Sequence, residues 1–364
     1  MIPTHGAENG HNGQVEQVVG VAQHYAWGDR HFIPDFLGCP DEGRPWAELW
    51  FGTHQAAPAT LIDGRPLADA TGELPYLLKV LAAAHALSLQ THPSIEQAQA
   101  GFERENDDGL AIDAPTRIYR DASAKPELLC ALTPFEALCG FRQVLASVEL
   151  CTVLGADTLA RSLRSLGLAA TVRALYRHEL DPEPIIAACA GWPHREARLV
   201  QELAEQYPGD PSVVVTLLLN RVTLSPGEAI FLGPGNLHAY LSGAGVEIMS
   251  ASDNVVRGGL TAKHVDVEEL LAVLDIQPLP DPRTAPDEIA PGWYCYHTPD
   301  TPFRLWRWEV AGATTHTATG RELLLCADGA TDLLARGEVA VLLPGETIEL
   351  HGIATVFRVE ERPV

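Results

Sequence analysis

Two potential metal ligands stand one residue apart in the segment SLQTHP at residues 88–93, which ends an apolar run. In an extended strand, residues i and i+2 point to the same face. The amide oxygen of Gln90 and an imidazole nitrogen of His92 could therefore bind one ion. A Gln-x-His pair often occurs by chance, and a polar turn after a buried strand is the simpler interpretation of this segment alone. The pair predicts a metal site only if other segments supply further ligands.

Two later segments supply them. Glu127 ends the tripeptide KPE, and His238 stands in GPGNLHAY at residues 233–240. Together with Gln90 and His92 they offer two nitrogen and two oxygen ligands, a set that favours zinc and also fits manganese, iron or cobalt. The set contains no cysteine, which argues against a structural thiolate site. We therefore predict one divalent ion per chain, zinc being favoured, with a coordination position open to a substrate.

The segments around these ligands resemble the type I mannose-6-phosphate isomerases (phosphomannose isomerases), zinc enzymes of the cupin superfamily. The resemblance covers most of residues 20–275. It rests on YAWG at 25–28, WAELWFGTH at 46–54, LKVL at 78–81, SLQTHP at 88–93, AKPELLCALTPFEALCGFR at 124–142, and LSPGEAIFLGPGNLHAYLSGAGVEIMSASDNVVRGGLTAKHVDV at 224–267. Carried over by position, it implies the same four zinc ligands, Gln90, His92, Glu127 and His238. The sequence departs from the family pattern at Asp29-Arg30, where Gly-Ser is common, and at Ala124, where histidine is common.

The implied reaction is an aldose–ketose isomerisation, which moves a proton between C1 and C2 through an enediol or enediolate. It needs a base beside carbon and a group that stabilises negative oxygen. Lys125 and Glu247 are the candidates for proton transfer, and Arg257, which matches an arginine usually assigned to the family's active site, is the candidate for electrostatic stabilisation. Each also has a structural alternative. Lys125 could neutralise Glu127, Glu247 could support a ligand histidine, and Arg257 could pair with Asp253.

Candidates for substrate binding lie in the same segments. The chain has 25 basic and 48 acidic residues, a net charge of −23, so an anionic substrate must meet a local basic cluster. Lys79, Ser88 and Lys263 could hold the phosphate, and Trp27 and Tyr240 could flank the sugar. Core packing of the aromatic residues and solvation of the lysines are the alternative roles. The same acidic excess argues against nucleic acid or an anionic membrane as a partner.

The cysteines and the hydropathy pattern indicate the compartment. The seven cysteines are odd in number, scattered and mostly set in apolar runs, so they are expected to be reduced core residues. The N-terminus has no apolar signal-peptide core, and no apolar stretch approaches the roughly 18 residues of a membrane-spanning helix. We expect a cytoplasmic monomer that acts on a small phosphosugar.

The hydrophobic patterns predict a mainly β fold with an α-helical insertion, and the resemblance implies cupin-type double-stranded β-helix (jelly-roll) units. Pro-Gly-Glu precedes a strand-like run at both 226–228 and 344–346, which supports duplicated units. The expected domains are a flexible lead (1–17), an N-terminal cupin-like β domain (18–142) with a short helical excursion near 93–112, an α-helical insertion (143–210), a central cupin-like β domain (211–277), a proline-rich linker (278–291) and a C-terminal β domain (292–364).

Two classes of function remain open. The first is a metal-dependent isomerase that interconverts mannose 6-phosphate and fructose 6-phosphate, in carbohydrate metabolism and GDP-mannose biosynthesis. The second is a catalytically silent cupin that binds a sugar phosphate as a sensor; a cupin oxygenase is a remote third. The four ligands and Arg257 favour the isomerase, because binding alone does not require an open metal.

Overall fold

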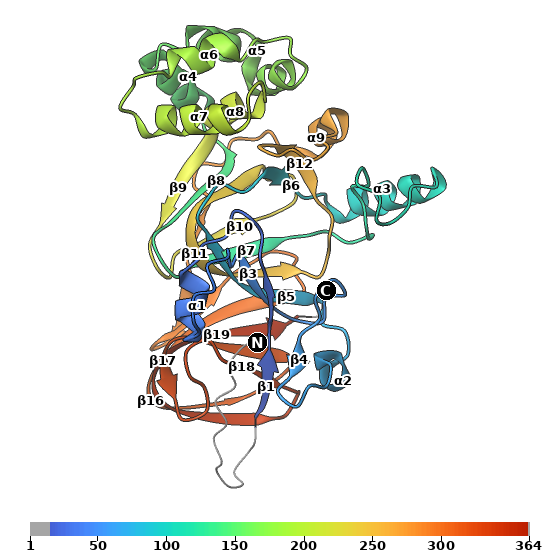
Figure 1. Cartoon of the computed structure of the whole chain (residues 1–364), viewed down its shortest axis with the longest axis vertical. Coiled ribbons are helices and arrows are strands. Elements are labelled where there is room, and N and C mark those ends of the chain that lie inside the picture. Colours follow the sequence, from blue (N-terminus) through green and yellow to red (C-terminus); the bar gives the residue numbers. More distant parts are fainter. Residues whose placement is uncertain (1–14, 363–364) are drawn as a thin grey trace.

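The computed structural model describes residues 15–362, which are stacked in tiers along the long axis of the molecule (Figure 1). A group of helices caps one end, curved strands fill the middle, and the C-terminal strands form the other end. The flexibility expected at the N-terminus falls mostly on residues 1–14, outside the described part. Glu16 and Gln17, also placed in that lead, instead begin a strand, because they pair with Val341 and Ala340.

The end tier is an antiparallel sheet built from both ends of the chain. Its strands are β1 (Glu16–Val19), β4 (Thr60–Leu61), β14 (Asp287–Ala290), β15 (Trp293–Tyr296), β16 (Phe303–Thr317), β17 (Glu322–Thr331), β18 (Val339–Leu342) and β19 (Thr347–Glu361). They lie in the order β14-β15-β16-β19-β17-β18-β1-β4. The expected linker at 278–291 is therefore partly ordered, because its proline-free stretch β14 pairs with β15.

The middle tier is the sheet that carries the predicted ligands. Its strands are β2 (Val21–Gln23), β3 (Glu48–Phe51), β5 (Tyr76–Ala83), β6 (Leu89–Thr91), β7 (Glu127–Ala131), β8 (Phe135–Phe141), β9 (Leu219–Leu224), β10 (Ala229–Leu232), β11 (His238–Ser250), β12 (Val256–Gly259) and β13 (Arg283–Thr284). The main path runs β13-β10-β7-β11-β5-β3-β2, and β6, β8, β9 and β12 branch from it. Strands expected in separate β domains, 18–142 and 211–277, are thus hydrogen-bonded to one another.

Strand β11 connects the two halves of this sheet. Its C-terminal half pairs with β5 and β7, and its N-terminal half pairs with β6 and β8. The pairing with β8 shifts register between Tyr240 and Ser242, and such irregularities bend a strand. Residues at the two ends of β11 can therefore face a common interior.

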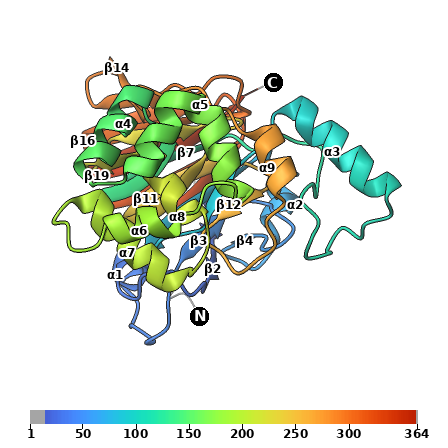
Figure 2. The ribbon, with the colours of Figure 1, turned by 90° about the horizontal axis from the view of Figure 1, so that it is seen from above.

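The insertion predicted at 143–210 is helical, which confirms a mainly β fold with an α-helical insertion. It comprises α4 (Val144–Val153), α5 (Asp157–Tyr176), α6 (Glu183–Ala188), α7 (Arg195–Gln206) and α8 (Ser212–Val215), followed by a 3-10 turn at Thr216–Leu218. We call residues 144–215 the helical cap. Figure 2 shows the cap lying over the β tiers. Leucines and valines at helical spacing, such as Leu159, Leu163, Val172 and Leu175, are buried in its core.

The remaining helices are α1 (Phe32–Leu37), α2 (Leu67–Thr71), α3 (Ile95–Asp107) and α9 (Val267–Val273). Helix α3 begins where the sequence predicts, because Ser94 and Gln97 form a capping box. Within residues 15–362, no helix combines the length and the hydrophobicity needed to cross a membrane. All seven cysteines are free, and all but Cys39 are buried.

Candidate active site

The sheet register places three predicted site residues side by side. On β6, Gln90 lies opposite His238 of β11 on one side and opposite Arg257 of β12 on the other. Residues directly opposite each other in adjacent strands share a face. A row of Arg257, Gln90 and His238 therefore crosses these strands, and His92 follows at the end of β6.

Glu127, the first residue of β7, lies close to both histidines. One potential ligand atom from each of His92, Glu127 and His238 lies within 4.8 Å of the others. Glu127 Oε1 is 3.3 Å from His92 Nε2, and Glu127 Oε2 is 3.7 Å from His238 Nε2. The three residues are exposed by only 0%, 3% and 2% in this order. The amide nitrogen of Gln90 faces His238 Nε2 at 3.4 Å, so a Gln90 oxygen ligand requires the amide to be turned over.

Backbone carbonyls orient both histidines. The Nδ1 atom of His92 is 2.9 Å from the Asn254 carbonyl oxygen, and that of His238 is 2.9 Å from the Asn236 carbonyl oxygen. An N–H donated from Nδ1 leaves the lone pair of Nε2 facing the centre. The buried Nε2 of His92 finds no hydrogen-bond partner among residues 15–362. Leaving such an atom unpaired costs free energy, so these residues fit a divalent ion.

The local charges hold the ligands in metal-binding protonation states. Burial acts to raise the pKa of Glu127, but Lys125, whose Nζ lies 3.1 Å from Glu127 Oε1, and the two histidines outweigh it and hold this pKa well below its usual value. Burial, helped by the neighbouring His92, lowers the pKa of His238 to about 4. Glu127 is therefore ionised and His238 neutral at pH 7, as metal binding requires.

These shifts predict how pH controls zinc binding. The folded-state pKa of His238, about 4, lies below its ordinary value of 6.5. The unfolded chain therefore takes up a proton that the fold excludes, and the metal-free protein should lose stability as the pH falls from about 6.5 towards 4. Zinc should raise the Tm by a similar amount from pH 7 down to about pH 5 and lose this effect as the pH falls through about 4, where a proton competes for the same nitrogen of folded His238. Melting curves with and without one equivalent of zinc test this, and a zinc effect independent of pH would contradict it.

A buried ion-pair network lies beside the ligands. The Lys79 Nζ is 3.2 Å from Glu48 Oε1 and 3.1 Å from Glu247 Oε2, and it lies 5.0 Å from the centre of the Trp50 ring. Its charge is already matched by two carboxylates and it is 6% exposed. Lys79, predicted to contact the phosphate, is thus paired with two buried carboxylates, one of which is Glu247.

Glu247 has the environment of a proton-transfer group. It accepts a hydrogen bond from the Tyr240 hydroxyl at 2.7 Å. Burial raises the pKa of Glu247. Lys79 and the Tyr240 hydroxyl oppose this shift, the charges of Glu127 and Glu48 add to it, and the net direction is upward. A carboxylate with a raised pKa is better matched to exchanging a proton near neutral pH. Tyr240, predicted to flank the sugar, is 4% exposed, and its hydroxyl is bonded to Glu247.

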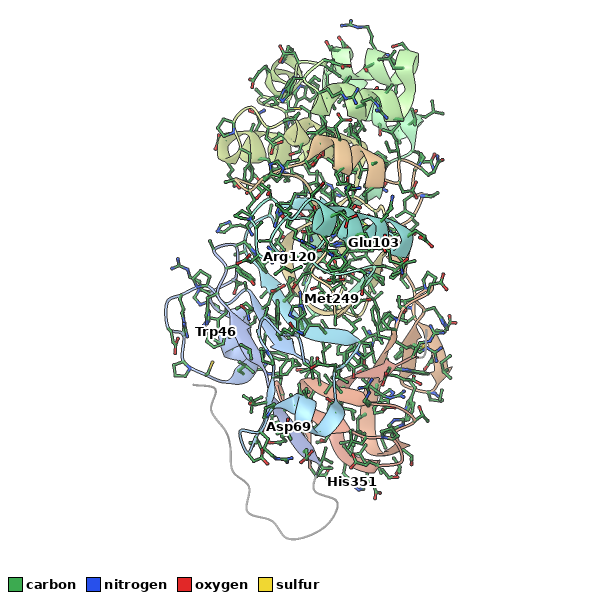
Figure 3. All side chains as sticks on the ribbon, turned by 90° about the vertical axis from the view of Figure 1, so that its right-hand side faces the viewer. Trp46, Asp69, Glu103, Arg120, Met249 and His351 are labelled. Atoms are coloured by element: carbon green, nitrogen blue, oxygen red, sulfur yellow. The ribbon has the colours of Figure 1, made fainter. Side chains whose placement is uncertain are left out.

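Two further cations, Arg120 and Lys263, lie near Arg257. Burial lowers the pKa of Arg257, and the charge of Arg120 lowers it further. The pKa of Lys263 is likewise lowered by burial, by Arg257 and by Arg120. These three side chains therefore lie close enough to repel one another. Figure 3 shows Arg120 in the middle tier of the molecule. In a chain of net charge −23, such a cluster favours an anion.

Ser88 and Trp27, also predicted to contact the substrate, lie outside the ligand cluster and the ion-pair network described above. Ser88 is partly buried directly before β6. Trp27 is partly buried and stacks on Tyr25 with ring centres 5.8 Å apart. Asp253, the alternative partner of Arg257, pairs instead with His54 at 3.4 Å. Sequence reasoning missed Arg120 and Glu48; the quoted segment WAELWFGTH does contain Glu48, but nothing in its spacing indicates an ion pair.

Comparisons with known proteins agree with this geometry. Residues 16–144 match the family model described as phosphomannose isomerase type I, catalytic domain. The chain is 32% identical over 369 residues to a mannose-6-phosphate isomerase of Salmonella typhimurium, covering 92% of this chain and 94% of that protein. It is 32% identical over 359 residues to a mannose-6-phosphate isomerase of Homo sapiens, covering 81% and 82%.

Solved structures extend the match to the fold. A glutamate-to-alanine variant of phosphomannose isomerase from Salmonella typhimurium superposes with a TM-score of 0.88 and 30% identity, covering 96% of this chain and all of that chain. A mannose 6-phosphate isomerase crystallised with zinc and yttrium superposes with a TM-score of 0.83 at 30% identity and the same 96% coverage of this chain. These matches confirm the predicted cupin-type fold. The chain belongs to the type I mannose-6-phosphate isomerase family.

Proposed function

We propose that this chain is a zinc-dependent isomerase that interconverts D-mannose 6-phosphate and D-fructose 6-phosphate. The observation that carries the proposal is the convergence of the buried His92, Glu127 and His238 with Arg257, whose strand position lies opposite Gln90. The relatives named above bear the same activity in their names. We propose Gln90 as the fourth ligand.

Each residue has a distinct part in the proposed reaction. A divalent ion bound by the four ligands would polarise the sugar oxygens at C1 and C2. Glu247, fixed by Tyr240 and Lys79, removes the proton from C2 of mannose 6-phosphate and delivers it to C1. Lys125 transfers the hydroxyl proton from O2 to O1, so that the atoms balance. Arg257 keeps its charge throughout and stabilises the negative oxygen of the enediolate.

The sensor alternative makes a different prediction for the same assay. Purified protein is incubated with mannose 6-phosphate, and fructose 6-phosphate is measured through a coupled enzyme. The isomerase produces it until equilibrium is reached. A sensor would bind the sugar phosphate and retain its metal without turnover. The monomeric state stays a prediction, which light scattering on the purified protein would test.

The cation cluster predicts that the phosphate group is required. Binding energy from a remote group can position the reacting centre, so free mannose should turn over far more slowly than its 6-phosphate. We assign the phosphate to Arg120 and Lys263, with Ser88 and Trp27 as further substrate contacts. Arg120→Ala should raise KM for mannose 6-phosphate about tenfold, as expected for losing a charged hydrogen bond worth roughly 1.5 kcal/mol.

Free mannose serves as the control for this variant. Its kcat/KM should be nearly the same for the wild type and Arg120→Ala, because the sugar lacks the group that Arg120 binds. Arg120→Lys, which retains the charge, should recover part of the affinity. Equal losses on both sugars would show that Arg120 acts on the site as a whole and not on phosphate.

A further inference from the structure

The helical cap holds the backbone that directly follows Arg257. The Tyr176 hydroxyl at the end of α5 donates to the Gly258 carbonyl oxygen at 2.6 Å. The Leu260 N–H donates to Asp210 Oδ2 at 2.8 Å and lies 3.1 Å from Ser212 Oγ. These contacts join the cap to residues about 50 to 80 positions further along the chain. We call these three hydrogen-bond contacts between the cap and residues 258–260 the grip.

The gripped segment has an unusual backbone that needs support. Leu260 has a φ of 52°, a left-handed conformation that few residues other than glycine adopt. Gly259 has a φ of 130°, and a Cβ atom added there would lie 2.1 Å from Ser212 Oγ. Such conformations persist only where the surroundings impose them. The cap supplies those surroundings, and its residues Tyr176 and Ser212 are 3% and 0% exposed.

The same segment carries a register shift that affects Arg257. The pairing of β12 with β6 is irregular between Arg257 and Gly259, and irregularities of this kind re-aim neighbouring side chains. Arg257 thus stands immediately before a bulge whose far side is bonded to the cap. A change in the grip would rotate or shift the guanidinium relative to Gln90 and His238.

We propose that the helical cap positions Arg257 for catalysis and that Tyr176 is the positioning residue through which it acts. This inference rests on the proposed function, since it assigns a purpose to the cap within the same reaction. Tyr176 does not reach the reacting atoms; its hydroxyl fixes the carbonyl next to Arg257. The Tyr176 ring packs in the apolar core of the cap. Its hydroxyl is bonded to the Gly258 carbonyl of β12 and not to another residue of the cap, residues 144–215.

A double-mutant cycle tests the coupling. Tyr176→Phe keeps the buried ring and removes only the hydroxyl. In the wild-type background it should lower kcat about tenfold per zinc-loaded, folded site, because a displacement of about 1 Å can cost roughly a hundredfold. In the Arg257→Ala background it should change kcat less than about twofold, because no guanidinium remains to be misplaced. Equal losses in both backgrounds, or none in either, would overturn the proposal.

Thr171→Val is the matched control in the same helix. Thr171 is fully buried, lies 2.9 Å from the Ser162 hydroxyl and donates to the Gly167 carbonyl, so its bonds stay within the cap. This variant should lower the Tm and leave kcat unchanged. If Tyr176→Phe behaves in the same way, the role of Tyr176 is only structural.

Hydrogen exchange and a second variant, Asp210→Asn, test the grip further. Hydrogen exchange followed by mass spectrometry should show faster exchange at 256–260 in zinc-loaded Tyr176→Phe than in Thr171→Val, and equal rates would overturn the grip independently of activity. If Tyr176→Phe does not fold, Asp210→Asn replaces it in the cycle, because it weakens the acceptor of the Leu260 N–H at nearly constant volume. A wild-type protein without isomerase activity would refute the proposed function and leave the exchange result to decide the grip.

Discussion

Replacing Arg257 with alanine is expected to lower kcat about a hundredfold while the zinc content stays at one ion per chain. The side chain stands opposite Gln90 in the register of β12 and β6, and it is one of the mutually repelling cations at the site. A guanidinium placed there stabilises negative charge that develops only during the reaction, so its loss should appear in kcat. The measurement is kcat per folded, zinc-loaded site.

Two variants separate this role from a structural one. Arg257→Lys retains the charge but not the planar fork of donors, so its kcat should fall between those of the wild type and Arg257→Ala. Asp253→Asn tests the ion-pair alternative. Asp253 pairs with His54, so its substitution should leave kcat within about threefold of wild type, well inside the hundredfold expected for a lost catalytic donor. A normal kcat in folded Arg257→Ala would remove this residue from the catalytic set.

The convergence of three of the four predicted ligands follows from rules that act on local sequence. The alternation of a strand puts Gln90 and His92 on one face, and the types of Glu127 and His238 complete a ligand set. The structure brings His92, Glu127 and His238 together. The orientation of the Gln90 amide could not be predicted from the sequence, because it depends on which amide atom faces His238 on the neighbouring strand.

The role of Lys79 could not be predicted, because its partners come from other strands. Glu48 lies on β3 and Glu247 on β11, and both flank β5 in the sheet. Residue spacing gives no information about that strand order. From the sequence, Lys79 was a candidate to bind phosphate because no partner for its charge could be identified. The register places it opposite Glu247.

Arg120 was missed for a related reason. It lies in a loop outside regular structure, and its position is set by a distant residue. The backbone N–H groups of Arg120 and Asp121 both donate to Asn254 Oδ1, more than 130 positions away. The pairing of β1 with β18 across most of the chain was likewise not predicted. Periodicity identifies elements, but only long-range pairing decides which of them meet.

Replacing His238 with alanine is expected to abolish both zinc binding and turnover. The imidazole is 2% exposed, its Nδ1 is fixed by the Asn236 carbonyl, and its Nε2 faces Glu127 and Gln90. Removing it deletes one ligand and leaves Glu127 without one of its two neighbouring histidines. The zinc content should fall well below one ion per chain, and the zinc-dependent rise in Tm should vanish. A variant that retains stoichiometric zinc would refute His238 as a ligand.

Glu247→Gln is the matched comparison, because it changes another buried residue of β11 without removing a predicted ligand. The variant loses the ion pair with Lys79, but its amide oxygen can still accept the Tyr240 hydroxyl, and Lys79 keeps Glu48 as a partner, so the fold should survive. Zinc content and its effect on Tm should therefore remain normal, whereas kcat should fall at least about a hundredfold through loss of the proton-transfer group. If both variants lose zinc, Glu247 supports the metal centre. If Glu247→Gln has a normal kcat while His238→Ala is inactive, the base is another residue, and Lys125 is the next one to test. The contrast between the two ends of β11 thus separates holding the ion from moving the proton.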